Sequence, residues 1–93
     1  MTPAQKELAR HALGLPNRQR RSYRNHFVTG EGGSDHREWM ALVEAGHAWR
    51  RAGSQLRGLT GGDDLFRLTR AGAELALEKR ERLNPEDFPK VPA

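Results

Sequence analysis

Apolar residues recur every three to four positions near the start of the chain, and this spacing predicts an amphipathic helix over residues 3–14. Thr2 suits the N-cap, where its hydroxyl accepts a backbone N–H, and Pro3 suits the first helical position, which needs no N–H donor. Gly14 and Pro16 end the pattern. The first element is therefore expected to be a helix with one buried stripe.

A second helical pattern, over residues 34–45, follows the glycine-rich stretch "TGEGGSD". Ser34 is expected to be its N-cap, and Gly46 stands where a helix commonly ends in a left-handed residue. Its apolar positions are expected to face the core, and they are Trp39, Met40, Leu42, Val43 and Ala45.

The next segment alternates between apolar and polar residues, which is typical of a half-buried strand. "DLFRLT" places Phe66 and Leu68 on one face, and "HAWRR" supplies a partner strand, so the two predict a hairpin with a long glycine-rich tip. Trp49 in the first strand fits either the core or a contact surface.

A last helix is expected over residues 70–82, with Thr69 as its N-cap. Its inward positions are expected to be Ala71, Leu75, Ala76 and Leu83. The chain then continues as the proline-rich stretch "NPEDFPKVPA", in which Phe88 is the residue expected to dock back on the domain.

Between the first two helices, "PNRQRRSYRNHF" shows only a weak helical pattern. Tyr23 and Phe27 are four residues apart, so a short helical segment would place both on one side. The predicted fold is therefore mainly α with a β-hairpin, in the order helix, short helical segment, helix, two-stranded wing, helix. We expect a single domain over residues 1–83 and a tail over residues 84–93.

This order and part of the wording resemble winged-helix regulators of the MarR and PadR type. "ALVEAGHAWRR" followed by "LFRLTRAGAELAL" is similar to the end of a recognition helix, a wing and the helix after it. The resemblance covers about residues 34–80, and the matching positions are Leu42, Ala45, Gly46, Phe66, Leu68, Thr69, Ala71 and Gly72. The chain also resembles small proteins carried by bacteriophages and prophages, a resemblance that implies no activity.

The winged-helix resemblance implies that the helix ending at Gly46 lies in the major groove of duplex DNA. The outward residues of that helix are mostly acidic, however: Asp35, Glu38 and Glu44 against Arg37. Because duplex DNA is a dense line of phosphate charge, such a face is repelled unless Arg37 reaches the bases.

The charge of the chain is uneven, and its basic residues supply the candidate site. Residues 1–57 hold ten Lys and Arg against five Asp and Glu, whereas residues 58–93 hold six against seven, so the first part suits a polyanionic partner. We expect binding through the arginine-rich segment and the wing, with the candidates Arg18, Arg20, Arg21, Tyr23, Arg24, Arg37, Arg50, Arg51 and Arg57.

Other chemistry finds little support in the sequence. The chain has no cysteine, and its four histidines do not show the spacing of a metal site, so no metal or cofactor is expected. The glycine loop lacks the lysine of a P-loop, and Glu31 and Asp35 place negative charge where a phosphate would lie, so it is interpreted as a turn. No nucleophile motif indicates an enzyme, and no signal peptide or membrane span is expected.

Two functions stay open. The favoured one is a small non-enzymatic nucleic-acid-binding winged-helix protein of phage or prophage origin, with duplex DNA as the favoured partner. The alternative is a phage-encoded inhibitor, of the anti-CRISPR or host-takeover type, which docks on an acidic host protein through the same basic face. Either would act in the bacterial cytoplasm, as a monomer or a homodimer.

Overall fold

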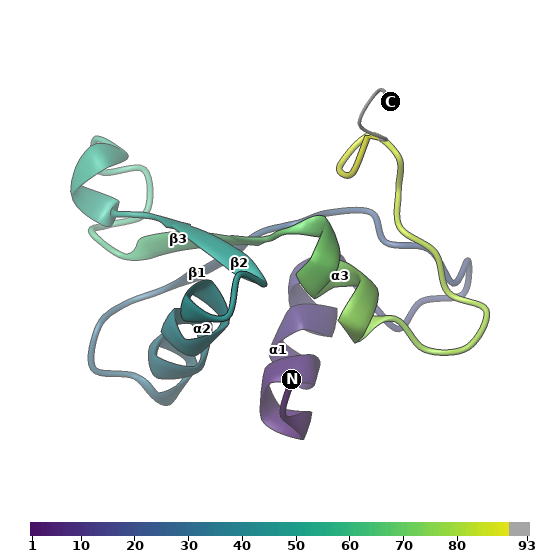
Figure 1. Cartoon of the computed structure of the whole chain (residues 1–93). Coiled ribbons are helices and arrows are strands. Elements are labelled where there is room, and N and C mark those ends of the chain that lie inside the picture. The colour runs from purple at the N-terminus through teal and green to yellow at the C-terminus, as the bar shows by residue number, and fades with distance from the viewer. Residues whose placement is uncertain (90–93) are drawn as a thin grey trace.

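The computed structural model describes residues 1–89 and contains helices and strands in an alternating order (Figure 1). The elements are α1 (Pro3–Leu13), β1 (Phe27–Thr29), α2 (Ser34–Glu44), β2 (Ala48–Arg51), the short 3₁₀ helix η1 (Gly53–Gln55), β3 (Asp64–Leu68) and α3 (Arg70–Ala76). The domain is mixed α/β with a three-stranded sheet, so the prediction of a mainly α fold with a two-stranded hairpin is confirmed only in part. Residues 90–93 of the expected tail lie outside the described residues.

The three strands form one antiparallel sheet in the order β1-β3-β2. Phe66 pairs with Phe27 on one side and with Arg50 on the other, so the β2–β3 hairpin predicted from the alternation is confirmed. In Figure 1, α1 and α2 both lie on the same side of the sheet, whereas no α-helix covers its other side. The sheet therefore has one covered face and one open face.

The core lies between the covered face and the helices. Trp39 on α2 is fully buried and stacks on Phe66 of β3 with 5.6 Å between ring centroids, as its expected core position requires. Small buried residues on α1 and α3 let these two helices approach closely. Phe88 of the C-terminal segment is buried in the same core, as expected. The buried apolar set is Ala9, Ala12, Leu13, Leu15, Trp39, Leu42, Ala48, Phe66, Leu68, Ala73, Ala76 and Phe88.

The helix caps follow the sequence in two of three cases. Thr2 forms a capping box with Gln5 at the start of α1, and the Thr69 hydroxyl accepts the Gly72 N–H at the start of α3. The predicted cap at Ser34 is wrong, because Gly33 is the N-cap and Ser34 is already helical. Gly46 does take the left-handed conformation, with φ 79°, after α2.

The short helix expected between the first two helices is absent, and this segment is extended. Its backbone groups bond to distant parts of the chain: Tyr23 N–H donates to Leu13 O, and Ser22 N–H donates to Arg82 O. The Asn25 side chain bonds to both the N–H and the carbonyl of Leu68. Tertiary pairing therefore overrides the weak local pattern, and Tyr23 stays exposed where the helical pattern would have buried it.

Helix α3 ends at Ala76, six residues earlier than predicted. The Arg10 guanidinium donates to the Ala76 carbonyl and to the Glu81 carboxylate. The Glu81 carboxylate also accepts the Glu78 N–H. These bonds turn the chain away from the helix axis. The inward residues of α3 are Gly72, Ala73 and Ala76, so the predicted inward positions Ala71 and Leu75 are wrong and both are exposed.

At Gly72, α3 packs directly against the backbone of His47, the residue before β2. A Cβ there would overlap the His47 carbonyl oxygen, and it would lie 2.8 Å from the carbonyl carbon. The same carbonyl accepts the Thr69 N–H, which fixes its position. Both contacted atoms belong to the His47 backbone, so neither can move aside as a flexible side chain would.

We therefore expect Gly72→Ala to lower the free energy of unfolding by about 3 kcal/mol, the upper part of the usual range for overpacking. Urea denaturation followed by circular dichroism measures this. The matched control is Gly46→Ala, where a Cβ meets nothing within 4 Å and only the positive φ opposes the change. A loss for Gly72→Ala no larger than for Gly46→Ala contradicts the prediction.

Candidate nucleic-acid interface

The candidate residues named from the sequence lie in four separate places. Those of the arginine-rich segment lie between α1 and β1, Arg37 lies on α2, two lie on β2, and Arg57 lies in the β2–β3 connection. The candidate residues therefore form four groups, and the surroundings of the groups differ.

The arginine-rich segment meets a second cationic segment that the sequence reasoning missed. Arg21 forms an isolated parallel bridge with Arg82: Ser22 N–H donates to Arg82 O, and Arg82 N–H donates to Arg20 O, both at 2.9 Å. The buried Ser22 hydroxyl also accepts the Asn84 N–H. We call the exposed cations on these two segments the loop-end cations, and they are Arg18, Arg20, Arg21, Lys79, Arg80 and Arg82.

A shallow depression of about 350 Å³ lies between the two segments. Arg20, Lys79 and Arg80 line it together with the Arg10–Glu78–Glu81 group. Arg20 has φ 55° and Arg80 has φ 70°, a left-handed backbone that side chains other than Asn, Asp and Gly seldom adopt. Such strain persists only where the surroundings impose it, and it clusters at functional positions.

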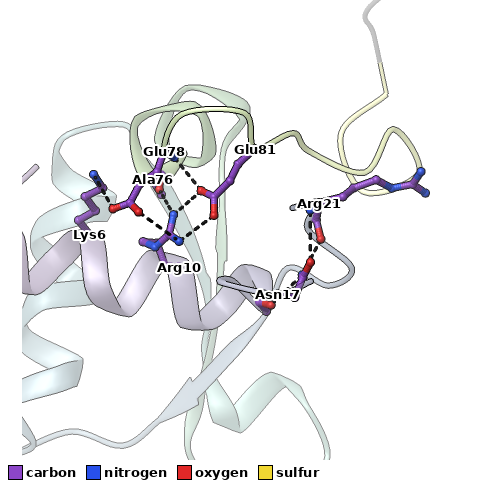
Figure 2. Close-up of polar contacts among 8 residues, drawn as sticks. Lys6, Arg10, Asn17, Arg21, Ala76, Glu78 and Glu81 are labelled. Atoms are coloured by element: carbon purple, nitrogen blue, oxygen red, sulfur yellow. Dashed lines mark hydrogen bonds and ion pairs between the residues drawn. The ribbon is translucent and has the colours of Figure 1, made fainter. Parts of the chain in front are cut away.

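Arg10 holds the second cationic segment in place (Figure 2). Its guanidinium pairs with both carboxylate oxygens of Glu81, the Nη2–Oε2 distance being 2.8 Å, and it also reaches Glu78 at 3.7 Å. The hydrogen bond from Arg10 lowers the pKa of Glu81 below its ordinary value. Lys6 adds an exposed pair to Glu78. The acidic residues of the depression are therefore already engaged.

The loop-end cations have no such anions. None of the six forms an ion pair with a carboxylate among residues 1–89. In Figure 2 the Arg21 side chain points away from Glu78 and Glu81, and only its backbone bonds to Asn17. Six unpaired cations on adjoining segments repel one another, and a bound polyanion relieves that repulsion.

Arg24 and Tyr23 are arranged differently. The Arg24 guanidinium donates twice to the His11 carbonyl near the C-terminus of α1, and it lies 5.3 Å from the centroid of the Tyr23 ring. A cation at a helix C-terminus is stabilised by the helix dipole. Arg24 therefore caps α1, while Tyr23 as a residue stays 59% exposed.

Arg50 is also occupied. It points to the covered side of the sheet and donates from Nε to Asp64 at 2.7 Å, and the same oxygen lies 2.8 Å from His36 Nε2. The other oxygen of Asp64 accepts the Gly53 N–H. The Arg50 hydrogen bond, with those of His36 and Gly53, holds the pKa of Asp64 well below its ordinary value. Arg50 therefore stabilises the base of the β2–β3 hairpin through its bond to Asp64.

Arg51 and Arg67 lie on the open face of the sheet, next to Trp49. The register pairs Trp49 with Arg67 and Arg51 with Leu65, and the Arg67 guanidinium lies 5.3 Å from the Trp49 ring centroid. Trp49 is 37% exposed, so of its two expected positions the structure shows the surface one.

A hollow of about 740 Å³ lies between α1, β1 and the start of α2. Its floor is apolar, with Leu8 and Phe27, and its rim carries Glu7, Asp35 and Glu38 against Arg37. Negative charge at this helix start agrees with the interpretation of the glycine loop as a turn. Arg37 shares this hollow with three carboxylates, and it forms no ion pair with them among residues 1–89.

Among residues 1–89, no three His, Asp or Glu side chains converge as metal ligands, and no helix has the length and apolar character to cross a membrane. No protein-family model, no curated protein and no solved structure is significantly similar to this chain.

Proposed function

We propose that this chain is a small non-enzymatic nucleic-acid-binding protein that holds the phosphate backbone with the loop-end cations. The single observation that carries the proposal is the joining of two cationic segments, far apart in sequence, by the Arg21–Arg82 bridge. Phosphate oxygens are the acceptors that closely spaced guanidinium and ammonium groups bind best. Arg20 and Arg80 keep an unfavourable φ beside one depression, where glycine would be the easier residue.

As part of the same proposal, we regard the arrangement as winged-helix-like. In support, α2 is followed directly by the β2–β3 hairpin with its long connection, and β3 pairs on its other side with β1. Because the outward side of α2 is mostly acidic, we favour a binding mode in which this helix does not enter the major groove. Asp35, Glu38 and Glu44 would face the phosphates there, and Arg37 is their only basic neighbour on the helix.

The test is a fluorescence-anisotropy titration with a labelled duplex and a labelled single strand of the same length, at about 50 and 200 mM salt. We expect the double variant Arg20→Gly/Arg80→Gly to bind about tenfold more weakly, with the slope of log K against log salt reduced by about 2. Its free energy of unfolding should change by less than about 1 kcal/mol, because glycine relieves the positive φ but adds chain entropy to the unfolded state.

The control is Arg37→Ala, which removes one charge from among carboxylates and should leave the affinity unchanged. Absence of binding to either nucleic acid at the lower salt overturns the proposal, and an acidic protein surface then becomes the partner that these cations fit. A loss on Arg37→Ala that exceeds the loss on the double variant would instead indicate binding through α2.

A further inference from the structure

The open face of the sheet carries an aromatic and cationic surface that the loop-end cations do not include. Alternation along the strands places Trp49 and Arg51 of β2, Arg67 and Leu65 of β3, and Val28 of β1 on this face. None of these five side chains is acidic. The helices cover the opposite face, where Phe66 and Leu68 lie (Figure 1).

We infer that this face is a stacking platform for the bases of single-stranded nucleic acid, an inference that rests on the proposed function and names its substrate class. An exposed Trp ring beside a guanidinium presents a flat apolar surface flanked by positive charge. Proteins that bind single strands combine these two features, since every base has a π-face and every nucleotide a phosphate. A duplex offers its bases only at the groove edges.

The neighbouring residues extend the platform toward the loop-end cations. Arg67 lines a depression of about 390 Å³ together with Tyr23, Arg24 and Asn25. The exposed Tyr23 ring is therefore the next aromatic surface along the path, and the chain just before it carries Arg20 and Arg21. Trp49, Arg67, Tyr23 and the loop-end cations thus form one route of alternating aromatic and positive groups.

Acidic residues border the route at one place. Glu86 and Asp87 line the same depression as Arg67 and Tyr23, and neither lies within ion-pair distance of Arg67 or Arg24 in the described structure. Two carboxylates beside a cationic path repel a phosphate chain. They lie in the depression that links Arg67 to Tyr23, so this link is the part of the route least favourable to a phosphate.

The test uses wild-type protein with three oligomers of one length: an oligothymidylate strand, an abasic strand with the same phosphates, and a blunt duplex. Stacking predicts that the thymidylate strand binds about tenfold or more tightly than the abasic strand, and that it quenches the emission of Trp49. The variant Trp39→Phe isolates Trp49 as the single reporter, and Trp49→Phe isolates the buried Trp39, whose emission should not respond.

The matched substitution is Trp49→Leu, which keeps an apolar residue and removes the ring. We expect it to weaken binding of the thymidylate strand by about 5- to 150-fold, the range for one lost base–aromatic stack, and to leave duplex and abasic binding unchanged. The control is Leu59→Ala, an apolar side chain in the β2–β3 connection that is more exposed than Trp49 and lies outside the sheet face.

The outcomes separate the two proposals. Binding of all three oligomers with equal affinity and no Trp49 quenching overturns the platform and leaves the phosphate-binding function standing. Absence of binding to all three overturns both. Should Trp49→Leu fail to fold, the comparison of thymidylate with abasic strand in the wild type still decides.

Discussion

Asp64→Asn is expected to destabilise the fold by about 1–3 kcal/mol at neutral pH, the cost of leaving buried hydrogen-bonding groups without a charged partner. The Asp64 carboxylate is buried at the start of β3, where it accepts from Arg50, His36 and the Gly53 N–H. The amide of asparagine carries no charge and offers only one accepting oxygen in place of two. For a domain of this size the melting temperature should fall by roughly 10 °C.

The same substitution should change the dependence of stability on pH. Arg50 and its neighbours lower the pKa of Asp64 in the folded state. The ionised carboxylate therefore contributes its full stabilisation above the unfolded-state pKa of about 4, and the contribution is lost as the pH falls toward the folded-state pKa. The difference between wild type and Asp64→Asn should accordingly be largest at neutral pH and shrink below about pH 4.

Asp63→Asn is the matched control for this experiment. Asp63 is the adjacent residue just before β3, it is exposed, and its side chain forms no hydrogen bond or ion pair among residues 1–89. Thermal melts at a series of pH values measure both variants. Equal melting temperatures for the two variants at neutral pH would show that the buried contacts of Asp64 do not stabilise the wing.

The contrast between Asp63 and Asp64 shows what the sequence can and cannot predict. Alternation correctly places Phe66 and Leu68 on the covered face, and the same alternation places Asp64 there too. Alternation does not, however, indicate what a buried carboxylate at this position binds. The partners of Asp64 come from α2 and β2, and no local pattern indicates that His36 and Arg50 meet at one carboxylate.

The candidate interface follows the same division. The run Arg18, Arg20 and Arg21 is evident in the sequence, whereas the helical pattern over residues 70–82 predicts that Lys79, Arg80 and Arg82 continue the last helix. Their position depends on Arg10, which is 71 residues from Glu81 in the chain. Periodicity describes neighbours along the chain, so it predicts α1, α2 and the hairpin but not a segment held by one distant side chain.

Arg10→Met is therefore expected to alter both stability and binding. It removes one partner of a buried ion pair and leaves Glu81 and the Ala76 carbonyl without their donor, at a cost of about 3 kcal/mol. Methionine keeps much of the apolar stem that packs on α3. With the segment after α3 released, Lys79, Arg80 and Arg82 lose their fixed position beside Arg20, and nucleic-acid affinity should fall severalfold.

Hydrogen exchange of individual amides tests whether the loss of affinity in Arg10→Met follows from release of the segment after α3. Ser22 N–H and Arg82 N–H donate across the bridge that joins the two cationic segments, so both amides should exchange faster in Arg10→Met than in wild type. The control is Lys6→Met, which removes only the exposed pair with Glu78 and should leave exchange and affinity unchanged. If the two amides stay protected while affinity falls, Arg10 acts on the ligand directly. If amide exchange and affinity both stay at their wild-type values, the backbone bridge alone holds the loop-end cations.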